Sequence, residues 1–128
     1  MSWKVTIDPA DRAFSIWIRL RDMRCKRCGS PVRLNDKGLP VSHQASHFQG
    51  RGKESTRFDP LNVDTLCGGC HSYFGANPAE HTEWQVAQKG QSVVNDIVLR
   101  SNMYTKKDRV SEKLYWTQKV KDDYGLTQ

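Results

Sequence analysis

Two Cys-x-x-Cys pairs constrain the fold of this chain more than any other feature of its sequence. The first pair is Cys25 and Cys28, the second is Cys67 and Cys70, and only 37% of the 128 residues are hydrophobic. A chain that buries little apolar surface often relies on a metal to hold its core together. Four thiolates complete a tetrahedral zinc site, and paired motifs of this spacing favour structural zinc over disulfides. We therefore predict one structural Zn²⁺ bound by the four cysteines.

His71 follows the second pair directly and leaves one alternative open. An imidazole next to Cys70 could replace one thiolate as a zinc ligand. The four thiolates need no fifth ligand, so His71 is equally available to a second metal with a different role. Spacing along the chain does not decide between these two assignments.

The chain carries no pattern for export or membrane insertion. No apolar run approaches the ~20 residues that cross a bilayer. The start, MSWKVTIDPADR, lacks the basic and then apolar order of a signal peptide. We therefore expect a cytoplasmic protein with no membrane partner, in a compartment where thiols stay reduced.

The excess of positive charge lies in the first half of the chain. Residues 1–60 hold 12 Lys and Arg against 6 Asp and Glu, whereas residues 61–128 hold 8 of each. A basic surface confined to one part of a molecule favours a polyanionic partner such as nucleic acid. A solvated basic face without a partner is the alternative, and charge alone does not separate the two.

The first helix is expected over residues 8–22. Asp8 suits the N-cap and Pro9 suits the first helical position. Apolar residues recur there at helical spacing and are expected to face the core: Phe14, Trp17 and Ile18.

Extended segments are expected around the second half of the zinc site. Period-two alternation predicts a strand over 39–48, followed by a Gly-rich basic loop over 49–57. A second extended segment over 58–66 leads into the second cysteine pair, and a short helix is expected from Cys70 to Phe74. The fold class is therefore α+β.

The remainder of the chain is expected to be helical. Pro78 opens a helix that Gly90 closes. Beyond it, the pattern predicts one or two amphipathic helices. We divide the chain into a zinc-stapled domain over 1–90 and a helical C-terminal extension over 91–128, packed on that domain or extending from it.

Three further residues form a pattern with the cysteines. His47 lies on the first expected strand, Asn62 stands before the short helix, and His71 lies on that helix. With "SHF" followed by "LNVDTLCGGCH", the sequence resembles the HNH nucleases, also called His-Me finger or ββα-metal nucleases. The stretches "AFSIWIRLRDMRCKRCG" and "RFDPLNVDTLCGGCH" look like the NinG (Rap) type of phage recombination nuclease and the RecA-dependent Ref type. The resemblance covers about residues 10–85 and leaves the C-terminal tail outside.

The resemblance implies both a fold and an activity. The fold would be a zinc-stapled ββα-metal (HNH) core with an N-terminal helix and C-terminal helices. The activity would be that of a metal-dependent DNA endonuclease in phage recombination or DNA processing, leaving 5′-phosphate and 3′-hydroxyl ends in the cytoplasm of a bacterial host. The partners would be DNA, including branched recombination intermediates, and a recombinase. Resolving a four-way junction would also require a homodimer, because two active sites are needed.

The matched residues suit distinct roles in phosphodiester hydrolysis. A neutral imidazole with a pKa near ~6.5 can accept a proton from water, so His47 is the candidate general base. Asn62 would hold that ring in one orientation through a side-chain hydrogen bond. His71 would bind a catalytic divalent ion, Mg²⁺ or Mn²⁺, which stabilises charge on the phosphate and the leaving oxygen.

The second ligand of the catalytic ion is the open question. In many HNH nucleases the residue before the base is an Asp or His that binds the ion, whereas this chain has Ser46 there. The first candidate is Asp59, which lies three residues before Asn62. The second is His43, which strand alternation places on the face of His47.

Several arginines and lysines are candidates for contacts with phosphates on either side of the cut. Three follow the candidate base in the loop: Arg51, Lys53 and Arg57. Three more lie on the first helix, away from its apolar positions: Arg12, Arg19 and Arg21. Such contacts would position nucleic acid without reading its sequence.

Two other functions remain open at this point. Ser46 favours a catalytically inactive, zinc-stapled module that binds DNA or acts as an adaptor, whereas the retained His47, Asn62 and His71 favour the enzyme. A nuclease that cuts RNA in place of DNA is the third possibility.

Overall fold

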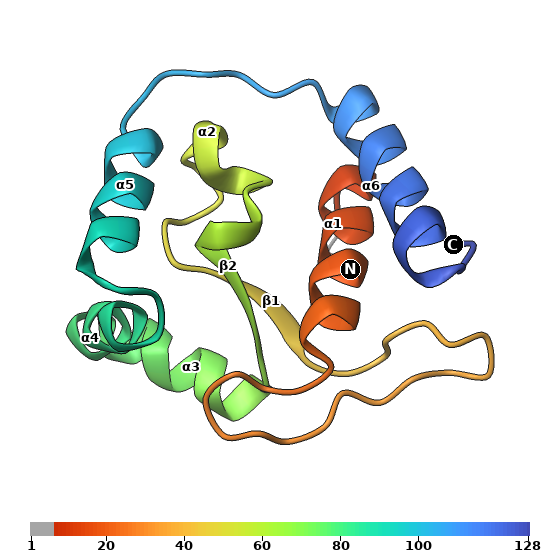
Figure 1. Cartoon of the computed structure of the whole chain (residues 1–128), viewed down its shortest axis with the longest axis horizontal. Coiled ribbons are helices and arrows are strands. Elements are labelled where there is room, and N and C mark those ends of the chain that lie inside the picture. Colours follow the sequence, from red (N-terminus) through yellow and green to blue (C-terminus); the bar gives the residue numbers. More distant parts are fainter. Residues whose placement is uncertain (1–6) are drawn as a thin grey trace, which may run out of the picture.

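The fold combines one small antiparallel sheet with helices. A computed structural model describes residues 7–128, which form six α-helices, a short 3₁₀ helix and two strands (Figure 1). The α+β class expected from the sequence is therefore confirmed. Among these residues, no helix is both long enough and apolar enough to cross a bilayer. In chain order the elements are α1 (Pro9–Asp22), β1 (Gln44–His47), α2 (Glu54–Arg57), η1 (Pro60–Asn62), β2 (Val63–Leu66), α3 (Gly68–Ala76), α4 (Pro78–Lys89), α5 (Gln91–Ser101) and α6 (Arg109–Tyr124).

Helix α1 begins and ends where its sequence dictates. The Asp8 carboxylate accepts a hydrogen bond from the backbone N–H of Ala10 at 2.8 Å, and Pro9 occupies the first turn. The helix ends at Met23, which adopts the left-handed conformation with φ of 59°. Phe14 and Ile18 are buried, as helical spacing predicted. This end of α1 leads directly into the first cysteine pair.

The two strands form a short hairpin-like ladder that carries the candidate site. Gln44 pairs with Leu66 at one end and His47 with Val63 at the other. The strand predicted over 39–48 is limited to residues 44–47, and it cannot begin earlier because His43 has a positive φ of 66°, which extended backbone does not permit. His43 therefore lies off the strand, and its predicted place in the strand alternation is wrong.

Helix α3 starts immediately after β2, at the second cysteine pair. Cys67 is its N-cap, and the helix runs to Ala76, two residues past the expected end. Along the chain, strand β1 thus precedes strand β2, and β2 leads directly into helix α3. His47 ends β1, Asn62 precedes β2, and His71 lies in the first turns of α3.

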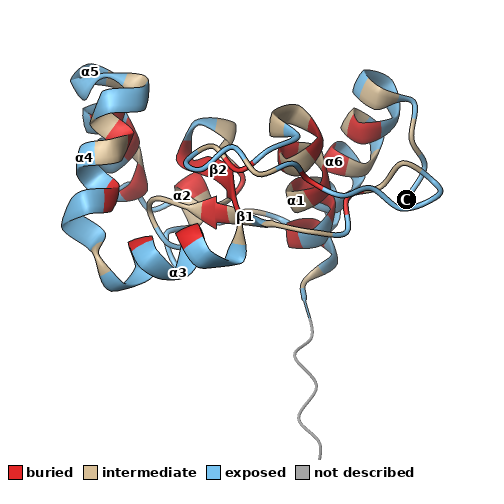
Figure 2. Ribbon diagram, turned by 90° about the horizontal axis from the view of Figure 1, so that it is seen from below, coloured by how far each residue is buried: buried red, intermediate tan, exposed pale blue. Residues whose placement is uncertain are grey.

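The helices of residues 91–128 lie on either side of the hairpin, and each packs against other helices (Figure 1). Helix α6 packs along α1, where Trp116 joins the cluster around Phe14 and Val120 joins a second cluster around Leu20. Helix α5 lies on the other side, against α4 and α2, and residues 102–108 cross between the two helices (Figure 1). The buried residues accordingly gather on the inner faces of the helices (Figure 2). One or two helices were expected here, and the structure has two, both packed on the rest of the chain.

Candidate functional site

The four cysteines come together as a possible metal site. Their sulfur atoms all lie within 4.8 Å of one another, and all four are free thiols. The Sγ atoms of Cys28 and Cys67 are 3.7 Å apart. Zn–S bonds of ~2.3 Å in a tetrahedron put sulfurs ~3.8 Å apart, so this spacing suits zinc. The predicted set of structural ligands therefore lies in one place.

Both cysteine pairs are shaped by their own backbone. In the first pair the N–H of Cys28 donates to the sulfur of Cys25 at 3.5 Å. In the second pair the N–H of Cys70 donates to the sulfur of Cys67 at 3.4 Å. The N–H of Lys26 also donates to the carbonyl of Thr65 at 2.9 Å, which fastens the first pair to β2. The ligand geometry is thus set locally, by two similar turns.

The metal-free thiols would not ionise together. The Ser30 hydroxyl, hydrogen-bonded to Cys28, is the largest of several contacts that lower the pKa of that thiol to about 6. Burial raises the pKa of the Cys70 thiol to about 12, against the effect of the nearby Arg27 guanidinium. Because zinc binds thiolates, metal binding would release the proton of Cys70 and depend on pH.

His71 is placed away from the four sulfurs and toward a cavity. Among the described residues, only the four cysteines form a cluster of three or more metal-binding side chains. His71 is exposed on α3 and lines a cavity of about 620 Å³ between α1, β1 and the loop after β1. His47 lines the same cavity. The two histidines therefore face one space, as the predicted shared role requires.

His47 is held in one tautomer. Its Nε2 lies 2.8 Å from the backbone carbonyl oxygen of Arg57. A carbonyl only accepts, so Nε2 carries the proton and Nδ1 keeps its lone pair. Burial lowers the pKa of His47 below its ordinary value, although the bond to the Arg57 carbonyl acts in the opposite direction. The ring is therefore neutral at pH 7, with a free basic nitrogen.

Asn62 acts on the loop after β1 and not on the His47 ring. Its side chain is fully buried, accepts from the N–H of Gln49 at 2.8 Å and donates to the carbonyls of Gln49 and Thr56. Within residues 7–128 these are the hydrogen bonds of its side chain. The predicted direct bond to His47 is wrong, because Asn62 closes the loop whose end, Arg57, contacts the imidazole.

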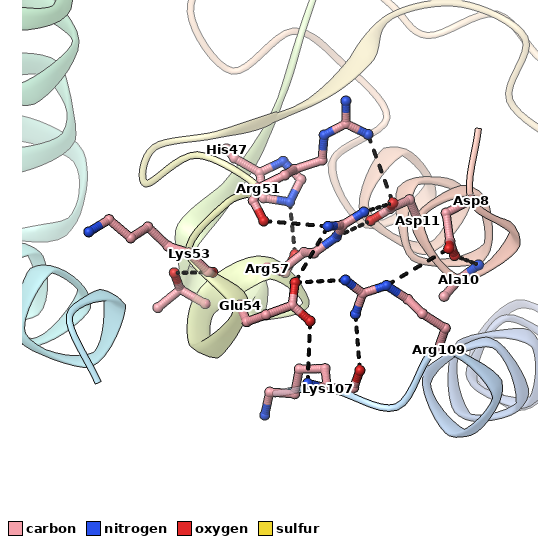
Figure 3. A network of polar contacts seen from close by, with 11 residues as sticks. Asp8, Ala10, Asp11, His47, Arg51, Lys53, Glu54, Arg57, Lys107 and Arg109 are labelled. Atoms are coloured by element: carbon pink, nitrogen blue, oxygen red, sulfur yellow. Dashed lines mark hydrogen bonds and ion pairs between the residues drawn. The ribbon is translucent and has the colours of Figure 1, made fainter. Parts of the chain in front are cut away.

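Asp11 is a site residue that the sequence analysis missed. Its buried carboxylate, on α1, forms an ion pair with the Arg57 side chain, whose Nε lies 2.9 Å from Oδ1 (Figure 3). Its other oxygen is 3.8 Å from Arg51. The only signal in the sequence was its position three residues after the N-cap, which indicates a helix start and no more. Asp11 thus fixes the residue that orients His47.

Arg57 consequently has a structural role. Its guanidinium is engaged by Asp11 and also by Glu54 at 3.5 Å. Glu54 in turn pairs with Arg109 on α6 at 2.6 Å, and this contact is the main reason that the pKa of Glu54 falls to about 2 (Figure 3). The predicted phosphate contact of Arg57 stays a prediction, and the contacts that the structure shows for its guanidinium are internal.

Neither candidate for the second catalytic-metal ligand is available. The Asp59 carboxylate caps η1 through the N–H of Leu61 at 2.9 Å and pairs with Arg100, and it does not line the cavity. His43 lines the cavity, but both of its nitrogens are used. Its Nε2 lies 3.0 Å from the carbonyl of Ser30, and its Nδ1 lies 2.8 Å from the hydroxyl of Ser42. Both predicted ligand roles are corrected to structural ones.

The two remaining basic residues of the loop lie in different places. Arg51 lines the cavity with His47, and its side chain is 59% exposed. Lys53 instead lies over a smaller hollow beside Asn102, to which its Nζ donates at 3.2 Å. Of the three predicted phosphate contacts in the loop, Arg51 is the one positioned beside the candidate base.

Comparisons with known proteins identified no similar protein. A scan against protein-family models, a search of curated proteins and a search of solved structures each found no match. The function is therefore argued from the geometry of the cavity and from the chemistry of the residues that line it.

Proposed function

We propose that this chain is a metal-dependent endonuclease that hydrolyses phosphodiester bonds of DNA, with His47 as the general base. The main support is the state of His47. Its proton is held on Nε2 by the Arg57 carbonyl, its Nδ1 has no hydrogen bond within residues 7–128, and its ring lines a cavity with His71. A fixed, neutral imidazole on the wall of an open cavity can take the proton of an attacking water.

The cavity also offers charge for a phosphate. Arg51 stands beside His47 with a largely exposed guanidinium, which can contact a nonbridging phosphate oxygen. His71 would hold the divalent ion, Mg²⁺ or Mn²⁺, which when bound offsets negative charge on the phosphate and the leaving oxygen. The chain's own residues thus divide between proton acceptance at His47 and phosphate positioning at Arg51.

The ligand set for the divalent ion is sparse. Asp11 is the one carboxylate that lines the cavity, and it is paired with Arg57. His71 would therefore bind the ion with water and phosphate oxygens completing its coordination, which Mg²⁺ and Mn²⁺ accept. We expect weak ion binding in the absence of DNA and activity that rises with added Mn²⁺ into the millimolar range.

Nicking of supercoiled plasmid tests the proposal. The zinc-loaded wild-type chain should nick DNA in the presence of Mn²⁺, and His47→Ala should reduce the rate by about 10²- to 10⁴-fold. His81→Asn is the matched control, because His81 is the one histidine of four outside the cavity. An equal loss in both variants, or undiminished nicking by His47→Ala, would exclude His47 as the base.

One observation favours a second candidate, an inactive DNA-binding or adaptor module. Within residues 7–128 no cluster of three metal-binding side chains exists apart from the four cysteines, and Ser46 stands where a second ligand would be expected. DNA binding without nicking in Mg²⁺, Mn²⁺, Ni²⁺ or Zn²⁺ would support this module. Preferential cleavage of RNA over DNA would instead redirect the proposal to an RNA nuclease.

A further inference from the structure

One face of α1 forms a wall of the cavity along most of the helix. Its lining residues recur at spacings of three, one and four, which places them on one stripe: Asp11, Phe14, Ser15 and Arg19. A rise of 1.5 Å per residue separates the two ends of this stripe by roughly 12 Å. Asp11 stands at the end near Arg51, and Arg19 stands at the opposite end, near His43.

Arg19 carries a positive charge that no carboxylate balances. The carbonyls of Ser15, Pro40 and Ser42 accept hydrogen bonds from its Nε and Nη1 at 3.3–3.4 Å. Within residues 7–128 its Nη2 has no acceptor and the side chain has no ion pair, and residues 1–6 contain no Asp or Glu. The guanidinium is only half-exposed, and burial lowers its pKa, with Arg12 as the second cause.

This arrangement sets Arg19 apart from the other half-buried arginines. Arg21, Arg57, Arg100 and Arg109 have side chains 18–32% exposed, and each has a carboxylate within 4 Å: Asp22, Asp11, Asp59 and Glu54. Carbonyls accept hydrogen bonds from the Nε and Nη1 of Arg19, but within residues 7–128 no carboxylate balances its partly desolvated charge. Arg12, two turns earlier on the same helix, is exposed and does not line the cavity. A half-buried cation on a cavity wall that has no carboxylate of its own is the chemistry of an anion site.

We propose that Arg19 forms a phosphate-binding subsite at the end of the cavity opposite Arg51. The proposal rests on the proposed function in one respect: the phosphate belongs to the same nucleic-acid strand that His47 and His71 act on. Phosphates of one DNA strand follow one another every ~3.4 Å along the helix axis, so roughly 12 Å spans several of them. The strand would thus be held on both sides of the cut, which is the grip that an endonuclease needs.

Salt-dependent binding tests the subsite separately from cleavage. The zinc-loaded full chain carrying His47→Ala, without added divalent ions, is titrated against a fluorescent 20-base-pair DNA duplex from 50 to 300 mM salt. Adding Arg19→Gln should make the slope of log affinity against log salt shallower by about 0.9, the contribution of one phosphate contact. Arg19→Met, which keeps the aliphatic stem but not the charge, should act in the same direction. Lys121→Gln removes an equal charge from an exposed site on α6 outside the cavity and should leave the slope unchanged.

Each outcome bears on the subsite, and the nuclease proposal is judged separately. If the parent chain binds and neither Arg19→Gln nor Arg19→Met changes the slope more than Lys121→Gln does, the subsite is wrong and the nuclease proposal is unaffected. If the slope falls as expected but the wild-type chain never nicks DNA, the subsite stands and the nuclease proposal fails. If the parent chain binds no DNA at any salt concentration, both fail. Arg19→Met keeps the apolar part of the side chain, so it also keeps the test decisive should Arg19→Gln unfold the chain.

Discussion

The cysteine cluster and the histidine cavity share the first turns of α3, yet they are built in different ways. Cys70 and His71 are neighbours in sequence, one buried in the cluster and the other exposed to the cavity. The cluster gathers four ligands from two similar turns, each shaped by its own N–H to sulfur bond. The side chains that line the cavity are instead oriented by contacts with residues far away in the sequence.

His47 illustrates the long-range construction. Its imidazole is oriented by a carbonyl ten residues later, at Arg57. Arg57 in turn forms an ion pair with Asp11, which lies 46 residues away on α1. Asn62 closes the loop that connects His47 to Arg57. If His47 is the base that we propose, stability and reactivity depend largely on different contacts. Each can therefore be broken while the other is kept, and the predictions that follow use this.

Removal of one ligand from the predicted zinc site should have the largest effect. Cys67→Ser takes one thiolate from the cluster, and structural zinc contributes ~10 kcal/mol or more to folding in small zinc domains. We expect the variant to lose one equivalent of bound zinc and its cooperative thermal unfolding, as measured by metal analysis and circular dichroism. Ser30→Ala, which removes a hydroxyl beside Cys28 but no ligand, is the control and should keep both. A Cys67→Ser chain that unfolds like the wild type would show that the cluster is not a structural zinc site.

Loss of His71 should separate the two sites most clearly. His71→Ala leaves the four sulfurs intact, and substitution of an exposed side chain usually changes the free energy of unfolding by less than about 0.5 kcal/mol. We expect one bound zinc and an unchanged melting temperature, together with a fall in nicking of at least ~10²-fold, because an ion's stabilisation of the phosphate is worth several kcal/mol. Ser72→Ala, its exposed neighbour, should nick normally. Loss of zinc from His71→Ala would mean that the histidine belongs to the cluster.

Asp11→Asn should affect both the stability of the fold and the nicking activity, but each by less than the two variants above. The change leaves Arg57 without its counterion, and breaking a partly exposed pair of this kind should lower the free energy of unfolding by about 2–3 kcal/mol. The Asp11 charge raises the pKa of His47, so its removal should lower that pKa further. Nicking by the wild type should fall as pH drops through a midpoint below ~6.5, and in the variant this midpoint should move to still lower pH.

The pH profile is the readout that a purely structural role of Asp11 would leave unmoved. Asp36→Asn, in an exposed turn, is the matched control and should change neither the stability nor the midpoint. A midpoint for Asp11→Asn that stays in place or rises would contradict the link from Asp11 through Arg57 to His47.

The two sites also differ in how far they could be predicted from sequence. The cysteine cluster, the cap of α1 at Asp8 and the order of β1, β2 and α3 follow from patterns a few residues long, and each is present in the structure. Such patterns act through local backbone geometry and ligand chemistry, which a sequence displays directly. The scaffold was therefore largely predictable.

The surroundings of His47 were not predictable in the same way. Asp59 and Asp11 are equivalent as isolated carboxylates, and only tertiary packing gives one to Arg100 and the other to Arg57. His43 was misplaced because a single positive φ ends the strand before it, and no glycine marks that position. These features depend on which helix lies beside the loop. The sequence alone therefore singled out His47 as a candidate but misassigned the residues that orient its ring.

The smallest expected effect concerns Glu54, which joins the network around His47 to α6. Its pairing with Arg109 holds the pKa of Glu54 at about 2, below the ordinary value of ~4.3. A carboxyl whose pKa is lowered by folding stabilises the native state above the unfolded pKa, and that contribution disappears as pH falls from about 4 to 2. Because the pair is partly solvated, we expect Glu54→Gln to cost only about 0.5–1 kcal/mol at pH 7. In denaturant titrations the difference in the free energy of unfolding between variant and wild type should close toward pH 2.

The matched control is Glu83→Gln, which changes an exposed carboxylate on α4 without an ion pair in residues 7–128. It should unfold with the same free energy as the wild type at either pH. If Glu54→Gln still differs from the wild type in the free energy of unfolding at pH 2, Glu54 acts through packing and not through its charge. Helix α6 would then be joined to the network around His47 by packing contacts alone.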